Sequence, residues 1–324
     1  MKLFKDFDIR RDREALEDFL KDYPGGTALT LGKFDGLHAG HQKLISDICS
    51  HRRNAEGKRR AAVVIAFGKA TYRVVANEFR KTLTEARERS FLLENTDVDL
   101  LVEFPFTEEL MQMEAETFLK EVLSELFAVT YLSVGDDFCF GRGRRGNREF
   151  LQSHVQDFTI ELSCIPRMKD GDDIISSTLI SGLLEEGNVT RAAKLLGHPY
   201  FALGCVEHGA KIGRTIGFPT LNISCEGDKV LPLRGVYETK VTLLSTGECY
   251  NGITNVGMKP TVKQSDTQNI ETHLLDYTGN LYDAEIRVEF LHFERPEVKF
   301  SDLTELQSQL NRDLEEAKKY FQKN

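Results

Sequence analysis

The chain changes the periodicity of its apolar residues near its middle, and this change restricts the folds that it can adopt. Between Thr27 and about Ser163, apolar runs such as "AAVVIAF" and "VDLLVEF" alternate with helical patterns such as "AETFLKEVLSELF". That alternation predicts a parallel sheet with helices on both faces, whose ligands bind beyond the carboxyl ends of the strands. After Tyr200, short alternating strands are separated by glycine turns, as in "YETKVTLLSTGECYNGITNV", which predicts an antiparallel β-barrel. The sequence therefore predicts two domains of different architecture.

The boundary between these domains is predicted near Glu185. There the segment "ISSTLISGLLEEGNVTRAAKLLGHPY" has the pattern of two short helices broken at Gly187. We therefore predict an α/β domain over residues 1–185 and a β domain over residues 186–324, because each stretch is long enough to bury its own core.

The last segment of the chain, "SDLTELQSQLNRDLEEAKKYF", predicts a terminal helix. Ser301 is placed to cap its first turn, because a serine hydroxyl can accept a hydrogen bond from a free backbone N–H group. The predicted apolar face of this helix carries Leu303, Leu306, Leu310 and Leu314.

The overall composition is that of an ordinary soluble globular protein, with 40% apolar and 29% charged residues among 324. A net charge of −9 argues against broad nucleic-acid binding. The six cysteines are scattered without a C-x-x-C pair, which favours reduced thiols over a disulfide framework. No signal peptide is visible, and no apolar run reaches transmembrane length. We therefore expect a cytoplasmic protein that binds small molecules and no membrane or nucleic acid; composition makes no prediction about its oligomeric state.

Residues 29–44, "LTLGKFDGLHAGHQKL", join a predicted buried strand to a predicted amphipathic helix through a glycine-containing loop. His38 and His41 are three residues apart at the helix start, so both imidazoles are expected on one helix face. Free N–H groups and the helix dipole favour an anion there, and the glycines let the backbone approach a ligand closely. This geometry suits a phosphate chain. Two alternatives are a metal site, which needs further ligands at recognisable spacing, and a histidine that only caps the turn.

The stretch "GKFDGLHAGHQKLI" resembles the nucleotidyltransferase signature of bacterial bifunctional riboflavin kinase/FAD synthetases, and "SVGDDFCFGRGRRGN" and "ISSTLISGLL" resemble further segments of that family in the same order. The resemblance implies a Rossmann-like domain that adenylylates FMN, with Asp137 as a flavin-site or structural carboxylate. For Ser177 and Thr178 the alternative to phosphate binding is helix capping alone. The ATP-binding residues that the resemblance implies in this domain are Gly32, Phe34, Asp35, Gly36, His38, His41, Ser177 and Thr178.

In the second domain, "GRTIGFPTLNI" closely resembles the riboflavin kinase motif, and "GVYETKV", "IETHLLDYTGNLYDAEIRVEF" and "ERPEVKF" follow in the family's order. The resemblance implies that Glu271 is the general base for the riboflavin 5′-hydroxyl. Arg295 is either a flavin contact or the partner of a surface ion pair. Thr220 and Asn222 are implied as magnesium ligands, which suits a cation that prefers hard oxygen ligands. The ATP-binding residues implied here are Gly213, Thr215, Thr220 and Asn222.

The first domain departs from the family pattern at several positions. The arginines expected after the Ser-Thr pair are replaced by Leu179 and Ser181, and Cys139 stands at another common arginine position. The segment "AFGKAT" lacks the usual proline and histidine. Losing a bidentate cation removes charge-assisted hydrogen bonds to phosphate. A nearby basic loop is either a solvated surface or a substitute source of positive charge; it carries Arg142, Arg144, Arg145 and Arg148.

The resemblance as a whole implies an enzyme that uses Mg²⁺ and ATP to phosphorylate riboflavin to FMN and then to adenylylate FMN to FAD, releasing pyrophosphate. One alternative is a riboflavin kinase whose first domain is degenerate. An alternative from another class is a flavin- or nucleotide-binding regulatory protein without turnover, although such a protein would not require a base at Glu271.

Overall fold

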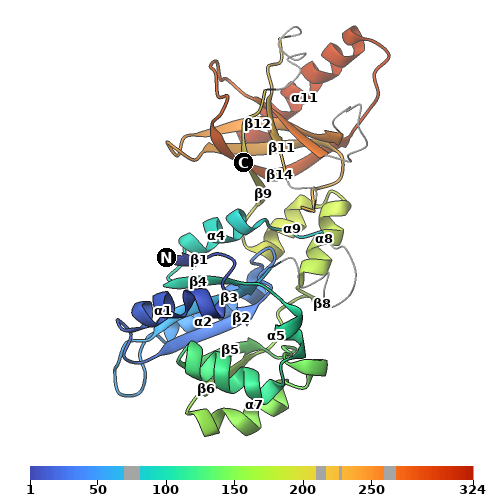
Figure 1. Cartoon of the computed structure of the whole chain (residues 1–324). Helices are drawn as coiled ribbons and strands as arrows, with labels where there is room; N and C mark the ends of the chain where they lie inside the picture. Colours follow the sequence, from blue (N-terminus) through green and yellow to red (C-terminus); the bar gives the residue numbers. More distant parts are fainter. Residues whose placement is uncertain (69–80, 209–216, 226–227, 259–267, 324) are drawn as a thin grey trace. The chain divides into compact units, whose positions relative to one another are not determined.

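The computed structural model describes residues 1–68, 81–208, 217–225, 228–258 and 268–323. The chain folds into two compact units, residues 1–176 and 177–324 (Figure 1). The second unit begins at helix α8 (Ser177–Glu185), which packs against α9 (Val189–Leu196). The division thus precedes the predicted boundary near Glu185. No helix in the described part of the chain has the length and apolar character needed to span a membrane.

The first unit contains a six-stranded sheet in which every described strand pair is parallel, as the alternating pattern predicts. The short first strand of the chain, at one edge of this sheet, had no signal in the sequence pattern. In spatial order the strands are β1 (Lys2–Phe4), β4 (Leu100–Phe104), β3 (Ala61–Phe67), β2 (Thr27–Gly32), β5 (Val129–Gly135) and β6 (Glu161–Ile165).

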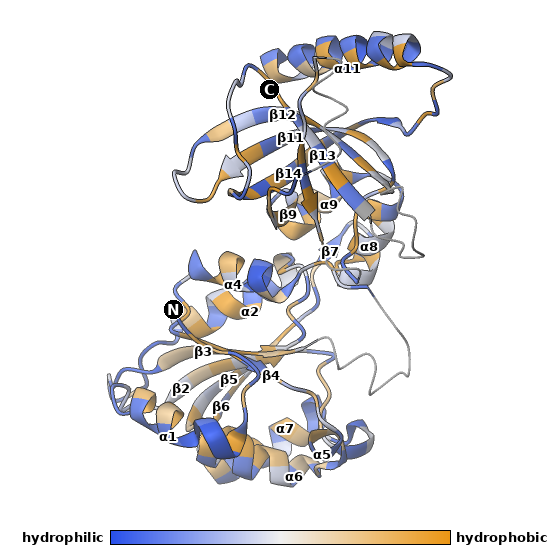
Figure 2. Ribbon diagram, turned by 45° about the horizontal axis from the view of Figure 1, so that its top comes forward, coloured by the Kyte–Doolittle hydropathy of each residue, from blue (hydrophilic) through white to orange (hydrophobic). Residues whose placement is uncertain are grey.

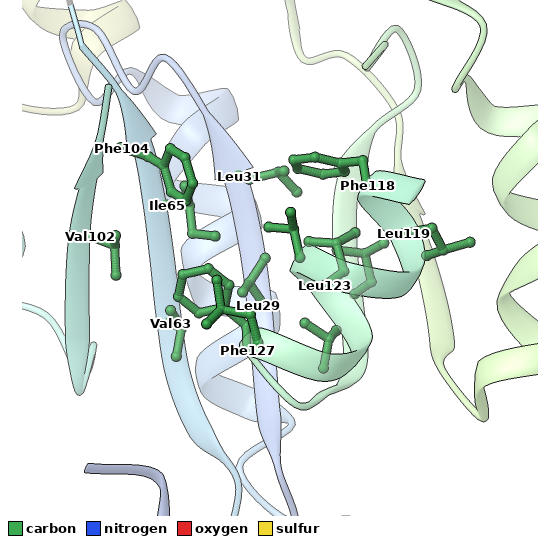
Figure 3. Packing of buried hydrophobic residues seen from close by; sticks show 14 of the residues in the cluster. Leu29, Leu31, Val63, Ile65, Val102, Phe104, Phe118, Leu119, Leu123 and Phe127 are labelled. Carbon is green, nitrogen blue, oxygen red and sulfur yellow. The ribbon is translucent and has the colours of Figure 1, made fainter. Parts of the chain in front are cut away.

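Helices cover both faces of this sheet, and each face has its own core (Figure 2). Successive side chains of a strand point to opposite faces, so Leu29 and Leu31 pack with the helical segment η1 (Phe118–Leu126) on one side (Figure 3). Ala28 packs on the other side with α2 (Ala39–Ser50) and α4 (Ala86–Glu94). The remaining elements of this unit are α1 (Ile9–Leu20), α5 (Glu108–Gln112), α6 (Ala115–Thr117), η2 (Arg142–Arg144), α7 (Arg148–His154), η3 (Val155–Phe158), β7 (Lys169–Asp170) and β8 (Asp173–Ile174).

The strand order reverses at β2, because β3 and β4 lie to one side of it and β5 and β6 to the other. In open α/β sheets this reversal leaves a crevice outside the carboxyl ends of the two strands that meet there. The loop that follows β2 therefore opens at the position where such sheets bind ligands.

The second unit is an antiparallel six-stranded sheet that curls into a nearly closed barrel, as predicted. Its two outermost strands approach one another, since the N–H group of Glu207 donates to the Asn222 carbonyl at 2.8 Å. Inside the barrel the hydroxyls of Thr239, Thr254 and Thr272 form a buried hydrogen-bonded row, with separations of 2.7 and 2.8 Å. In spatial order the strands are β10 (Leu221–Ser224), β13 (Gln268–Leu274), β12 (Cys249–Met258), β11 (Gly235–Leu243), β14 (Glu285–Pro296) and β9 (Tyr200–Cys205).

The terminal helix α11 (Leu303–Lys323) packs over the outer face of this sheet (Figure 1). The predicted Ser301 cap is wrong, because the Asp302 carboxylate accepts from the N–H groups of residues 304 and 305, at 2.9 Å each. Ser301 instead donates its own N–H group to Glu305 at 2.8 Å. The predicted apolar face is also shorter than expected, because Leu303 is 61% exposed.

Candidate active sites

A pocket of about 250 Å³ lies at the strand-order reversal of the first unit. The ends of β2, β5 and β6 and the start of α2 line it. Five of the residues assigned to ATP or flavin from the sequence are brought together in its wall: Gly32, Phe34, His38, His41 and Asp137.

The two histidines of this pocket stack on each other, with ring centroids 3.8 Å apart and an interplanar angle of 19°. Burial lowers the pKa of His38 to about 4, and burial together with neighbouring His38 lowers the pKa of His41 well below its ordinary value. Both imidazoles are therefore neutral near pH 7. Their Nδ1 atoms are buried without a hydrogen-bond partner, so each ring has an unsatisfied polar atom beside the pocket.

Glycine at position 40 leaves room for the ring of His38, because an added Cβ would lie only 3.2 Å from that ring. His38 is the N-cap residue of α2, yet its side chain makes no capping hydrogen bond. The alternative that this histidine only caps the turn therefore does not apply to His38. Within the described ranges the histidine pair also has no third metal-type ligand close enough to share an ion with it.

Asp35 and Gly36 lie behind the pocket and hold the loop. The Asp35 carboxylate accepts hydrogen bonds from the N–H group and the hydroxyl of Thr84, at 3.0 and 3.3 Å, and the Gly36 N–H group donates to the Thr84 hydroxyl at 3.1 Å. Burial raises the pKa of Asp35, against the effect of these hydrogen bonds. Phe34 and Leu37 have φ angles of 47° and 43°, which cost on the order of 1 kcal/mol each for residues with a side chain. The loop is thus strained and anchored from behind.

Arg167 is a pocket residue that sequence reasoning missed. Among the described residues it is the only lysine or arginine in the wall of this pocket. Its guanidinium lies 3.6 Å from Asp136 and 3.9 Å from Asp137, and the side chain is 49% exposed. The only available signal was an arginine shortly after a predicted strand, four residues beyond Ser163, which is too common to single out.

Of the two alternatives for the basic loop, a solvated surface agrees better with its described contacts, because Arg142 and Arg145 are largely exposed. Arg142 and Arg145 both approach Glu114, at 3.1 and 3.9 Å, and none of the loop arginines is in the described wall of the pocket. Ser176 closes the wall, whereas Ser177 and Thr178 begin α8 and belong to the second unit. Their contact with phosphate stays a prediction.

A second pocket, of about 390 Å³, lies between the outer face of the barrel and α11. This volume falls in the range of small-molecule sites. Phe218, Ile253, Phe300 and Leu310 contribute apolar walls, which suit a flat aromatic ring system. Thr220 and Glu271 provide polar groups of the same wall.

The strand register places three polar residues in a row, because Glu271 on β13 is opposite Asn222 on β10 and Asn255 on β12. Glu271 and Asn255 line the pocket, and Asn222 lies next to them outside its wall. The side-chain amide of Asn269 donates to the Glu271 carboxylate at 2.7 Å and to the Asn222 amide oxygen at 3.0 Å. The Asn269 amide oxygen is buried without a partner. The fold thus collects carboxylate and amide oxygens beside Thr220, which is the kind of ligand set that Mg²⁺ prefers.

Arg295 also lines the second pocket, but its charge is already paired. Its guanidinium binds both oxygens of Asp313 on α11, at 2.8 and 2.6 Å. Asp313 is only 3% exposed, so the partner of Arg295 is a buried carboxylate rather than a surface one. Gly213 and Thr215 lie outside the described residues.

Fold and pockets together define a two-domain protein with a nucleotidyltransferase-like α/β unit and a kinase-type barrel, each with its own small-molecule pocket. The FAD synthetase family model matches residues 20–179, and the riboflavin kinase family model matches residues 196–321. The chain belongs to the bifunctional riboflavin kinase/FMN adenylyltransferase family.

Relatives of that name resemble the chain over nearly its whole length. The protein of Haemophilus influenzae is 36% identical, over 91% of this chain and 94% of the relative. The protein of Bacillus subtilis is 32% identical, over 93% of this chain and 95% of the relative. A solved structure from Streptococcus pneumoniae, titled as a macrolide-efflux protein, has the same fold with a TM-score of 0.80 and 27% identity, covering 92% of this chain and 96% of that one.

Proposed function

We propose that this chain phosphorylates riboflavin to FMN in its second unit and adenylylates FMN to FAD in its first. The observation that carries the proposal is that each unit has a pocket of its own, lined by residues that the sequence motifs assign to the two reactions. Family membership supports both activities.

In the kinase reaction, Glu271 accepts the proton of the riboflavin 5′-hydroxyl as the oxygen attacks the γ-phosphorus of ATP. The hydrogen bond from Asn269 holds the carboxylate in one orientation, which matters because a base must meet the attacking hydroxyl at hydrogen-bond distance. The apolar walls of the pocket receive the flavin ring.

Thr220 and Asn222 would hold the magnesium ion of this reaction. The residues present suit a magnesium ion, because the unpartnered oxygen of Asn269 and the Asn222 amide oxygen are neighbours of the Glu271 carboxylate. When bound, the ion offsets negative charge on the transferred phosphate.

In the adenylyl transfer, a phosphate oxygen of FMN attacks the α-phosphorus of ATP, the bond to the bridging oxygen breaks, and pyrophosphate leaves. Neutral His38 and His41 donate N–H hydrogen bonds to phosphate oxygens rather than supplying full positive charges. Arg167 supplies a full charge at the same pocket, in place of the arginines that the family has near Ser181. Asp35 keeps the histidine loop in position.

The alternative is a riboflavin kinase without adenylyltransferase activity, and one feature of the sequence favours it. Leu179 and Ser181 replace arginines that bind phosphate in the family. Incubation with riboflavin and Mg-ATP, followed by chromatography, separates the possibilities. FAD supports both activities, FMN alone supports the kinase, and neither product supports a flavin-binding regulator without turnover.

The proposed enzyme works on small molecules in the cytoplasm. No disulfide joins its cysteines in the part of the chain that the structure describes, which fits a reducing compartment.

A further inference from the structure

Outside both pockets, the second unit contains a cluster of one histidine and two carboxylates. Glu238 lies on β11, and His292 and Glu294 lie on β14. One potential ligand atom from each lies within 4.8 Å of those of the other two. In the described part of the chain this is the only such group of three.

The strand register creates this cluster. Glu238 is opposite His292 across the antiparallel pair, and irregularities in the ladder lie on both sides of that position. They leave Glu294 as an extra residue between Phe293, opposite Tyr237, and Arg295, opposite Val236. The irregularity between Glu238 and Thr239 sets His292, rather than Leu291, opposite Glu238. His292 and Glu294 are two residues apart on β14, so both side chains face the same side of the sheet as Glu238.

The cluster buries negative charge that the described residues do not neutralise. Glu238 is 2% exposed, and its Oε2 atom is buried without a hydrogen-bond partner. No lysine or arginine in the described ranges forms an ion pair with Glu238 or Glu294. Arg295, which follows Glu294 in the sequence, is bound to Asp313. A buried carboxylate in this position requires a proton or a cation.

His292 gives the cluster a nitrogen ligand and an opening to solvent. It is exposed, and its ring stacks on Tyr320 of α11, with centroids 5.4 Å apart and an interplanar angle of 11°. An imidazole with two carboxylates suits first-row divalent ions, whereas Mg²⁺ favours oxygen ligands alone. Three protein ligands leave further coordination positions for water.

We propose that Glu238, His292 and Glu294 bind one divalent first-row transition-metal ion, such as Mn²⁺ or Zn²⁺, at a site separate from the kinase pocket. The ion would bind the buried Glu238 oxygen that has no hydrogen-bond partner. It would also link two strands to the terminal helix, because Tyr320 holds the ring of one ligand.

Equilibrium dialysis of the full chain, treated first with a chelator and kept free of nucleotide, tests this proposal with Mn²⁺ and Zn²⁺ as separate probes. Wild type should bind one more equivalent of at least one ion than either His292→Gln or Glu238→Gln. Cysteine thiols are the same in all three proteins, so any zinc that they bind cancels in the comparison. His292 is exposed, so His292→Gln is expected to fold normally, as circular dichroism would verify.

Two controls complete the design. Asn222→Ala should still bind one more equivalent than Asn222→Ala combined with His292→Gln, because Asn222 belongs to the kinase site. His154→Gln, which removes a histidine on α7, should retain the extra equivalent as well. Equal stoichiometry in wild type and both cluster variants for both ions would overturn the proposal and leave a proton shared by the two glutamates. Loss of an equivalent in Asn222→Ala, with no further loss when His292→Gln is added, would also overturn it, since both substitutions would then act on one ion in the kinase pocket.

Discussion

Glu271 is the residue on which the proposed kinase reaction depends most directly. Glu271→Gln keeps the size and hydrogen-bonding capacity of the side chain but cannot accept a proton at neutral pH. General-base catalysis contributes about 10²–10⁴-fold, so FMN formation should fall by about that factor while riboflavin binding is retained. Steady-state kinetics and a flavin-binding titration measure the two effects.

The matched control for this change is Glu248→Gln, in the exposed hairpin between β11 and β12. It should turn over like wild type. Wild-type turnover in a correctly folded Glu271→Gln protein would remove this carboxylate from the mechanism.

Arg167 is predicted to replace the arginines missing at positions 179 and 181. Arg167→Ala should slow FAD formation from FMN at least about tenfold, because a hydrogen bond to a charged group is worth about 1.5–3 kcal/mol. Arg144→Ala should have little effect, since that arginine is outside the described wall of the pocket. An adenylylation assay in which Arg144→Ala is slow and Arg167→Ala is not would show that the basic loop supplies the positive charge for the phosphates.

The low pKa of buried His38 should make the folded protein less stable at acidic pH. Folded His38 takes up a proton only near pH 4, against an ordinary value of 6.5. Between these values the unfolded chain binds the proton and the folded chain does not, so stability is complete above about pH 6.5 and decreases as the pH falls. His38 alone should lower the free energy of unfolding by about 3 kcal/mol as the pH falls from about 6.5 to about 4.

Denaturant unfolding of wild type and His38→Gln from pH 7.5 to 4.5 would measure this effect. The variant should lose less stability than wild type over that interval, whatever its stability at pH 7.5. Parallel curves for the two proteins would contradict the low pKa of the buried imidazole.

At the scale of elements, a buried ion pair between Arg295 and Asp313 joins α11 to the barrel. Asp313→Asn leaves the guanidinium of Arg295, which is 18% exposed, without a counter-charge. Removing one partner of a buried pair is strongly destabilising, and partial exposure of Arg295 reduces the expected loss to about 2–3 kcal/mol. The KM for riboflavin should rise too, because both residues line the kinase pocket. Thermal unfolding and kinetics would measure the two changes.

Glu316→Gln is the matched control on the same helix. Its ion pair with Lys319 is about half exposed on both sides, and such surface pairs contribute at most about 1 kcal/mol. If both substitutions cost the same small amount, the Arg295–Asp313 pair does not hold the helix.

At the scale of the whole molecule, the two pockets lie in separate compact units. His38→Ala combined with His41→Ala should therefore suppress FMN adenylylation and leave riboflavin phosphorylation nearly intact. Riboflavin supplied with Mg-ATP should accumulate as FMN, which chromatography detects. Equal loss of both activities would indicate one shared site or a general folding defect.

The sequence by itself determined both architectures, because the spacing of apolar residues follows directly from which face of a strand or helix is buried. It also predicted the strand, loop and helix around His38 and His41, and the helix break at Gly187, where the structure has a φ angle of 78°. These features depend on residues close together along the chain.

Only the tertiary structure decided which distant residues meet. Glu271 lies beside Asn222, and Arg295 faces Asp313, because of strand register and helix packing. Arg167 enters the first pocket for the same reason, and Glu238 meets His292 only through an irregular strand pairing. A shift of one residue in register turns a side chain to the opposite face. No local pattern in the sequence specifies that register, because it is set by the packing of the whole sheet.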